Sequence, residues 1–436
     1  MTRMHIPCVV GIDLGSTTTK AIIIDLERGE ILGRGITNSR SNYDRAAEVA
    51  RTEAAITARF HLLRQRVEAR AGAERLNKLM RAFRLEQTLY QLRRLESWVH
   101  DTVDKSVAEH LRPATHEVVG EMVKRIEAEE VAIFEAPEAP SRSDFFRDIV
   151  GSAWSRLAEE MANPQGPNFD LLLGLFDKCI IQVENEPLEL GFRDHISGAL
   201  ERIGNPEDVR AGVDEAVNAE LDLVATVGTG YGRARLPFPK EQIRSEILCH
   251  GLGASTMFPG TRTVLDIGGQ DTKAIQVDEN GIVTSFQMND RCAAGCGRYL
   301  GYIADEMNLG VHELGPLAEK SRQRVAINST CTVFAGAELR ERLSLGEKRE
   351  DILAGLHRAI ILRAMSLLAR SGGVDEEFTF TGGVANNAAA VRALRELIEE
   401  NYGKRTLNIS PDSIYTGALG AAIFAKRIAE ESAVAT

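Results

Sequence analysis

Short runs of β-branched and other apolar residues open the chain and predict strands. Cys8–Asp13 and Ala21–Ile24 are runs of this kind, and Arg28 with Gly29 marks a turn toward a third strand. From about Leu223 onward such runs return. They now alternate with helical periodicity and are separated by glycine-rich turns. This alternation is typical of an α/β protein.

A different pattern lies between these two parts. From Arg45 to Arg112 there is no proline and a single glycine, and apolar residues recur every three or four positions. That period predicts amphipathic helices rather than strands. A looser, proline-containing stretch follows as far as about His195. We predict a mainly helical insertion, and a plain helical spacer with a solvated, charged face is the simplest interpretation of its purpose.

One short pattern occurs twice. Asp13–Ile22 and Asp266–Ile275 share Asp, Gly, Thr, Lys, Ala and Ile at matching positions, and Asp25 and Asp278 extend the match. An apolar run precedes and follows each copy, so each copy predicts a strand–turn–strand element. Two such elements imply two similar lobes, whose turns can hold a polyphosphate from both sides.

The turns of both copies have the residues expected for binding phosphate. Backbone N–H groups of a tight turn converge on an anion, and glycine lets the main chain approach it closely. The predicted phosphate-binding residues are Gly15, Ser16, Thr17, Thr18 and Lys20 in the first copy and Gly268, Gly269 and Gln270 in the second. Asp13 and Asp266 have the wrong charge for phosphate, so we expect them to hold the waters of Mg²⁺. Two ordinary hairpins in duplicated domains would leave the same pattern.

A third glycine cluster follows a strand-like run near residue 380. Gly382, Gly383 and Asn386 precede a predicted helix, Ala388–Glu399. Such a turn lets a flat adenosine lie against the backbone, and helix capping by Asn386 or Asn387 is a compatible alternative. Neither a Walker A loop nor a dinucleotide fingerprint in its usual context is present. The nucleotide prediction, ATP with Mg²⁺, therefore depends on the three turns in this order.

Composition and charge narrow the classes of function. The chain has 436 residues, of which 44% are hydrophobic and 26% charged, so we expect a soluble globular protein. A net charge of −11 argues against nucleic-acid binding, because phosphate contacts need a basic surface. No run of eighteen apolar residues and no signal-peptide pattern are present, so we expect a cytoplasmic protein without a membrane span.

Cysteines at two predicted helix starts are candidates for metal binding. Cys292 precedes the predicted helix Arg298–Met307, and Cys331 precedes Thr332–Leu343. A helix N-terminus favours the thiolate form that binds iron. Two ligands cannot complete an iron–sulfur cluster, so a second subunit would have to supply the others. From spacing alone, buried core cysteines are the favoured interpretation.

The order of the three turns resembles the superfamily of sugar kinases, actin and heat-shock ATPases. That resemblance implies an α/β, two-lobed fold, here with a large, mainly helical insertion. Its two connecting helices would match Ser329–Glu341 and Tyr415–Ala425. The implied organisation runs in chain order: 1–44 first part of the N-terminal lobe, 45–195 insertion, 196–260 remainder of that lobe, and 261–436 C-terminal lobe with the adenosine turn and the cysteines.

Longer strings resemble one family within that superfamily. Gly11–Thr17, Thr229–Arg233, Asp266–Asp271, Cys292–Gly295 and Asn328–Ala335 are similar to the activator ATPases of 2-hydroxyacyl-CoA dehydratases and the ATPase subunits of benzoyl-CoA reductase. The resemblance implies a [4Fe–4S] cluster shared by two subunits, with Cys292 and Cys331 as this chain's ligands. Cys296 stands where the family usually has threonine, and we treat it as a bystander.

The insertion influences which member of the family we expect. A long inserted form resembles the larger ATPase subunit of benzoyl-CoA reductase. Its implied partners are a homologous smaller ATPase subunit, the reductase subunits that bind the CoA thioester, and ferredoxin as electron donor. Alternatives are a homodimeric dehydratase activator, a small-molecule kinase and a chaperone-like ATPase. For hydrolysis, Gln270 is the first candidate to orient the attacking water, with Asp13 and Asp271 as the other candidates.

Overall fold

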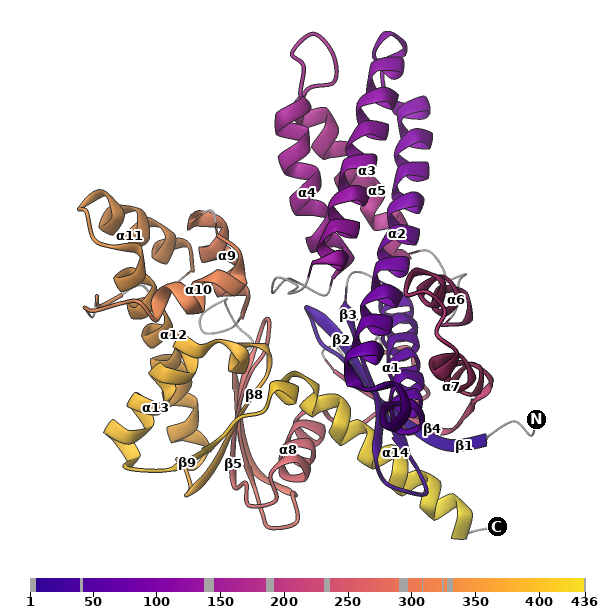
Figure 1. Cartoon of the computed structure of the whole chain (residues 1–436). Coiled ribbons are helices and arrows are strands. Elements are labelled where there is room, and N and C mark those ends of the chain that lie inside the picture. The colour runs from indigo at the N-terminus through magenta and orange to yellow at the C-terminus, as the bar shows by residue number, and fades with distance from the viewer. Residues whose placement is uncertain are drawn as a thin grey trace. The chain divides into compact units, whose positions relative to one another are not determined.

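The computed structural model describes residues 5–39, 42–136, 145–185, 192–230, 236–289, 297–307, 309–323, 325–327 and 332–434. The chain forms two compact units (Figure 1). One unit is helical and comprises Met1–His5 and Ala58–Glu220. The other comprises Ile6–Thr57 and Leu221–Thr436 and contains two sheets. The α/β class with a largely helical additional part is therefore confirmed, whereas the predicted segment boundaries stay a prediction.

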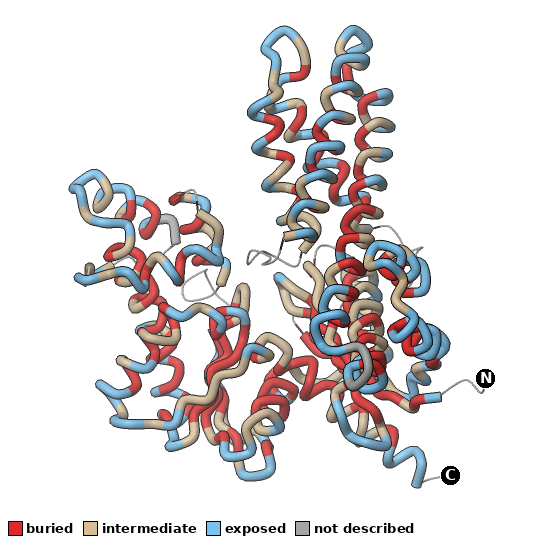
Figure 2. The backbone as a smooth tube through the Cα atoms, in the orientation of Figure 1, coloured by how far each residue is buried: buried red, intermediate tan, exposed pale blue. Residues whose placement is uncertain are grey.

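The first sheet contains the first copy of the repeat. Its strands are β1 (His5–Leu14), β2 (Thr18–Asp25), β3 (Ile31–Asn38) and β4 (Glu220–Gly230), in the order β3-β2-β1-β4. β1 and β2 are buried along nearly their whole length because helices cover them (Figure 2). The helix α14 (Thr416–Val434) packs on β2, and α1 (Tyr43–Ala71) starts after β3.

The second sheet contains the second copy. Its strands are β5 (Thr263–Ile267), β6 (Thr272–Val277), β7 (Val283–Asn289), β8 (Glu377–Thr381) and β9 (Thr406–Asn408), in the order β7-β6-β5-β8-β9. β5, β6 and β7 pair antiparallel, while β8 and β9 continue the sheet in parallel. Its helices are α8 (Glu246–Met257), α9 (Gly297–Met307), α10 (Val311–Ala318), α11 (Thr332–Ser344), α12 (Arg349–Ser371) and α13 (Ala388–Tyr402).

The two copies of the repeat have the same register. Asp13 lies opposite Lys20 across β1 and β2, and Asp266 lies opposite Lys273 across β5 and β6. The extended match also has a structural cause. Asp25 Oδ1 accepts the N–H groups of two residues in the turn after β2, and Asp278 Oδ1 does the same after β6. The repeat is therefore a real duplication of a strand–turn–strand element.

The helix that packs against α14 is α8, not the one expected. The backbones approach so closely that a Cβ on Gly420 would lie 1.9 Å from the carbonyl oxygen of Cys249. The prediction that Ser329–Glu341 is a connecting helix is therefore wrong, because α11 packs against α9 and α12 instead. α8 is buried on most of its sides, so its sequence lacks the alternation that reveals a surface helix.

The helices of the helical unit are α2 (Ala73–Ser106), α3 (Arg112–Glu135), α4 (Phe146–Met161), α5 (Phe169–Asn185), α6 (Phe192–Arg202) and α7 (Glu207–Asn218). A hydrophobic core of this unit lies among α2, α3, α4 and α5. On α2 the buried positions include Leu76, Leu79 and Phe83, which confirms the predicted helical period. The buried Trp154 donates its indole N–H to the carbonyl of Leu172, 3.0 Å away.

One helix in the described part of the chain, α12, is long and apolar enough to cross a membrane by length and composition alone. Its apolar residues pack in the core of the second sheet's half, and 67% of the apolar stretch is buried there. These properties are those of a core helix.

Candidate functional site

The two repeated turns lie against each other. The first turn follows β1 at Gly15 and Ser16, and the second follows β5 at Gly268 and Gly269. A Cβ on Gly269 would lie 2.0 Å from Thr17 Oγ1, so no side chain fits between the turns there. The structure therefore brings together residues far apart in the sequence, as expected for two turns that hold one polyphosphate from both sides.

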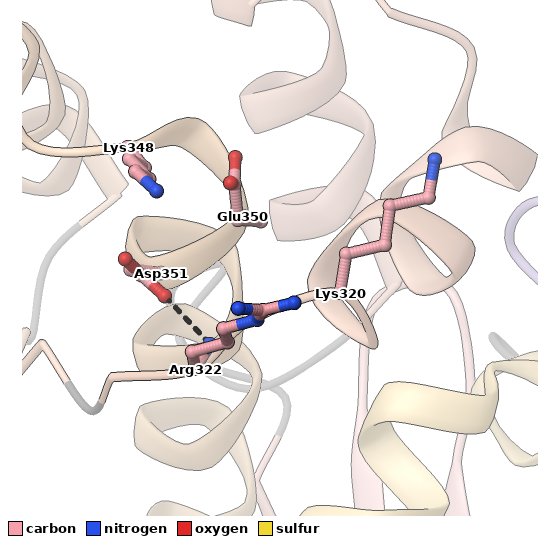
Figure 3. Close-up of a pocket in the computed structure, with 5 residues that line it drawn as sticks. All are labelled: Lys320, Arg322, Lys348, Glu350 and Asp351. Carbon is pink, nitrogen blue, oxygen red and sulfur yellow. Dashed lines mark hydrogen bonds between the residues drawn. The ribbon is translucent and has the colours of Figure 1, made fainter.

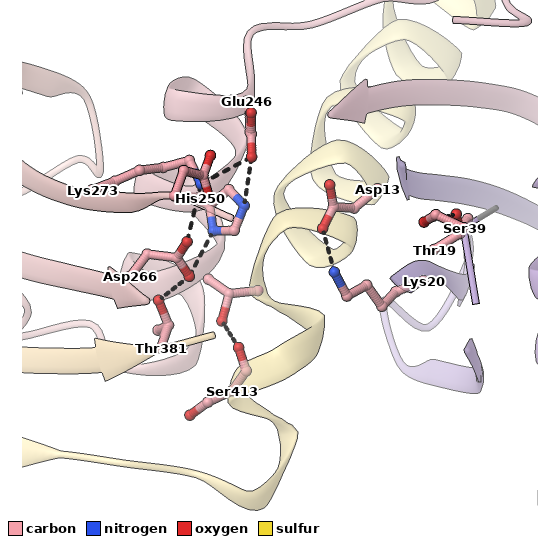
Figure 4. A network of polar contacts seen from close by, with 12 residues as sticks. Asp13, Thr19, Lys20, Ser39, Glu246, His250, Asp266, Lys273, Thr381 and Ser413 are labelled. Atoms are coloured by element: carbon pink, nitrogen blue, oxygen red, sulfur yellow. Dashed lines mark hydrogen bonds and ion pairs between the residues drawn. The ribbon is translucent and has the colours of Figure 1, made fainter. Parts of the chain in front are cut away.

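Asp13 stands at the end of β1 beside the first turn (Figure 4). Its Oδ2 lies 3.3 Å from Lys20 Nζ, and the residue is 2% exposed. The other carboxylate oxygen, Oδ1, is buried and has no hydrogen-bond partner among the described residues. A buried, unpartnered carboxylate oxygen is costly unless a ligand satisfies it. Asp13 therefore fits the predicted role of holding a hydrated cation.

Asp266 occupies the equivalent place in the second copy, within a denser network (Figure 4). Its Oδ2 lies 3.2 Å from Lys273 Nζ, its Oδ1 accepts from Thr381 Oγ1 at 2.9 Å, and His250 Nδ1 lies 3.3 Å from Oδ1. Burial alone would raise the pKa of Asp266, but the charges of His250 and Lys273 outweigh it and hold that pKa below its ordinary value. The carboxylate is ionised at neutral pH.

Lys273 is the centre of this network. Its Nζ lies 2.9 Å from Asp271 and 3.0 Å from Glu246, in addition to Asp266. Burial alone would lower the pKa of Lys273, but the three carboxylates raise it well above its ordinary value. In this structure Lys273 therefore forms ion pairs. Asp271 is one of its partners, and the role of Asp271 as an alternative candidate to orient the attacking water stays a prediction.

Two residues that the sequence analysis missed complete the site. Glu246 and His250 lie one turn apart on α8, and one ligand atom each from Asp13, Glu246 and His250 lies within 4.8 Å of the others. Burial raises the pKa of Glu246. Burial would lower the pKa of His250, but Asp266 raises it above its ordinary value. The only sequence signal was the spacing of a glutamate and a histidine on one helix face.

The third glycine cluster lies beside the same turns. Gly382 has a φ of 85°, and a Cβ there would lie 2.3 Å from the carbonyl oxygen of Ile267, at the end of β5. Gly383 and Asn386 are exposed next to it. Asn387, rather than Asn386, caps α13 by accepting from the N–H of Ala390. The exposed pair is thus available to a ligand, and adenosine binding there stays a prediction.

His357 supports this loop from the core. Its Nε2 lies 3.0 Å from Asn387 Nδ2, and its Nδ1 lies 2.7 Å from the carbonyl oxygen of Leu353. Burial lowers the pKa of His357 to about 4, so the ring is neutral at physiological pH. A neutral ring can donate at Nδ1 and accept at Nε2, which matches both contacts.

The second turn is hydrogen-bonded to the start of α9. The N–H groups of Gly297 and Arg298 donate to the carbonyl oxygens of Gly268 and Gly269, both at 2.8 Å. With its amide oxygen placed toward Arg298, Gln270 accepts from both terminal guanidinium nitrogens, at 2.8 and 3.2 Å. α9 therefore depends on the phosphate turn at its N-terminus.

The predicted cluster ligands Cys292 and Cys331, and Cys296, lie outside the described residues. The helices expected after them are confirmed, since α9 begins at Gly297 and α11 at Thr332. Cys8, Cys179 and Cys249 are buried, and burial raises the pKa of Cys8 and of Cys249 to about 12. Thiols of that kind are poor metal ligands.

A separate pocket lies away from the turns, lined by Lys320, Arg322, Lys348, Glu350 and Asp351 (Figure 3). Asp351 Oδ1 accepts from Ser321 Oγ at 2.8 Å and from the N–H groups of Arg322 and Gln323 at 3.1 Å. These bonds lower the pKa of Asp351 and hold the loop in place. The carboxylate thus has a structural purpose.

The fold and the facing turns define an ATPase of the actin, sugar-kinase and heat-shock class. The chain belongs to the BadF/BadG/BcrA/BcrD ATPase family, whose sequence model matches residues 10–425. It is 41% identical over 248 residues to the (R)-2-hydroxyglutaryl-CoA dehydratase activating ATPase of Acidaminococcus fermentans, covering 57% of this chain and 92% of that protein. It is 33% identical over 206 residues to one of the benzoyl-CoA reductase subunits of Thauera aromatica, covering 47% of this chain and 72% of that protein.

Solved structures agree with the fold. The crystal structure of the A. fermentans (R)-2-hydroxyglutaryl-CoA dehydratase component A matches with a TM-score of 0.52 and 26% identity, covering 97% of this chain and 99% of that chain. The activator of 2-hydroxyisocaproyl-CoA dehydratase from Clostridium difficile, with bound ADPNP, matches with a TM-score of 0.53 at 23% identity, covering 98% of each. The predicted two-lobed ATPase fold is confirmed.

Proposed function

We propose that this chain is an ATP-hydrolysing activator that passes low-potential electrons to a 2-hydroxyacyl-CoA dehydratase. The observation that carries the proposal is the hydrogen-bonded connection between the second phosphate turn and α9, the helix that begins directly after the segment with Cys292. In the sequence, α9 begins five residues after Cys292, so the proposal links the turn that would bind phosphate to a proposed cluster ligand. Relatives named as dehydratase activators, at 41–44% identity, support this reading over a benzoyl-CoA reductase subunit, at 33%.

The residues present fit ATP with Mg²⁺. Backbone of the two facing turns would hold the phosphates, and the loop at Gly382, Gly383 and Asn386 would hold the adenosine. Asp13, through its unpartnered Oδ1, and Glu246 would hold the hydrated ion, which neutralises phosphate charge when bound. Gln270 at the second turn would orient the attacking water. The positive charges of His250 and Lys273 keep the neighbouring Asp266 carboxylate ionised.

Cys292 and Cys331 stay the proposed ligands of a [4Fe–4S] cluster shared with a second subunit, which would supply one electron at low potential. Along the sequence, each of the two cysteine-containing segments is flanked by an exposed apolar residue. Met288 on β7 is 41% exposed just before the first cysteine segment, and Phe334 in the first turn of α11 is 68% exposed just after Cys331. Exposed large apolar side chains are typical of surfaces that a partner covers. They support a subunit interface here.

The larger ATPase subunit of a benzoyl-CoA reductase is the second candidate. The helical unit, Ala58–Glu220, favours it, because the activator matched at 92% of its length covers only 57% of this chain. In that case we propose a homologous smaller ATPase subunit, CoA-thioester-binding reductase subunits and ferredoxin as partners, in the cytoplasm.

Anaerobic purification from the source organism tests the proposal. We expect brown protein with about two iron atoms per chain, a nucleotide-dependent interaction with a CoA-thioester enzyme, and loss of iron in Cys292→Ser and Cys331→Ser. The matched control, Cys296→Ser, should keep its iron. A homodimer supports the dehydratase activator, and co-purification with a smaller homologous subunit supports the reductase. Colourless, iron-free wild-type protein would exclude both.

A further inference from the structure

We infer that Arg298 is a positioning residue that fixes Gln270 and transmits the state of the second phosphate turn to α9. This inference rests on the proposed function, since it deepens the role of the nucleotide site. Arg298 lies in the first turn of α9 and holds the Gln270 amide oxygen with both terminal nitrogens. A planar guanidinium that donates twice to one oxygen restricts both its position and its direction.

The backbone around this contact strengthens the connection. The first N–H groups of a helix have no partner within the helix and are usually satisfied by a capping side chain. In α9 two of them donate instead to the carbonyls of Gly268 and Gly269. A Cβ on Gly297 would lie 3.3 Å from the Gly268 oxygen, so the helix start and the turn are in contact. A shift of the turn therefore displaces α9.

A double-mutant cycle on ATP hydrolysis tests the positioning role. Because Gln270 and Arg298 would act as one unit, Arg298→Ala and Gln270→Ala should each lower kcat about 10- to 100-fold with little change in KM for ATP. The double variant should be no slower than either single variant. Arg298→Lys, which keeps the charge but loses the fork, should recover only part of the rate. Arg395→Ala, at an exposed arginine of α13, should behave as wild type.

The coupling between the second phosphate turn and α9 needs a separate measurement that does not depend on iron. In cluster-free protein, alkylation of Cys292 should change several-fold in rate when a non-hydrolysable ATP analogue binds, and Arg298→Ala should abolish that response. Multiplicative losses of kcat in the double variant, or an unchanged alkylation response in Arg298→Ala, would overturn the inference. Absence of iron from the wild-type protein would contradict the electron-transfer proposal, but it would not affect the coupling inferred for Arg298.

Discussion

Asp13→Asn is expected to slow ATP hydrolysis by about 100-fold or more, because it removes the charge that holds the hydrated cation. The carboxylate is almost completely buried, and within the described part of the chain only one of its oxygens is engaged, by Lys20 at 3.3 Å. Asparagine has nearly the same shape, so packing around β1 should survive. It also places an N–H₂ group where an acceptor is needed and leaves the Lys20 charge without its partner.

Steady-state kinetics at saturating Mg²⁺ measure this effect. We expect the loss in kcat, while binding of ATP without a divalent cation changes little. Asp278→Asn is the matched control, because it neutralises a carboxylate of the same repeat that only caps a turn after β6. Wild-type kcat in Asp13→Asn would show that the buried carboxylate has no part in hydrolysis, and the assignment of the first turn would have to be abandoned.

The duplicated turns were predictable because their chemistry is local. Asp13 and Lys20 are opposite residues on two strands joined by a short turn, so their pairing follows from the sequence once the hairpin is recognised. The same holds for Asp266 and Lys273. That two such turns would face each other followed from the repeat, and the contact between Gly269 and Thr17 agrees.

Glu246 and His250 could not be found in this way. They reach the site only because α8 packs against α14 and beside β5 and β6, contacts between segments far apart along the chain. α8 is apolar on most sides, so no periodic pattern marked it, and the connecting-helix prediction was placed on Ser329–Glu341 instead. The connection from Gln270 to Arg298 was missed for a related reason: it requires the start of α9 to lie beside the second turn.

The two copies of the repeat also differ in a way that predicts unequal stability. Asp271 in the second copy occupies the position that Thr18 has in the first copy. Its carboxylate is an additional partner of Lys273. Glu246 from α8 adds another. Lys20, by contrast, pairs among the described residues with the carboxylate of Asp13 alone. Lys273 is therefore the main compensating charge for three acidic groups around the second copy of the repeat.

Lys273→Met should consequently destabilise the protein by about 3–5 kcal/mol, the range for removing one partner from a buried ion pair. Lys273 is 1% exposed, so solvent cannot compensate the carboxylates that remain. The folded state raises its pKa well above the ordinary 10.5, so this stabilisation is complete at neutral pH and is lost only as the pH rises through the folded-state pKa. Lys20→Met should cost less, since one carboxylate is left instead of three.

Hydrogen exchange of peptides from β5 and β6, followed with denaturant, locates the loss. Fluorescence serves as the internal control, because both tryptophans, Trp98 and Trp154, lie in the helical unit and should report little change. The variant will also bind protons more readily near Asp266, so its stability should fall less steeply as the pH drops below 4 than that of the wild type. Equal losses in Lys20→Met and Lys273→Met would mean that Glu246 and Asp271 are satisfied by other groups, and that the network does not depend on this lysine.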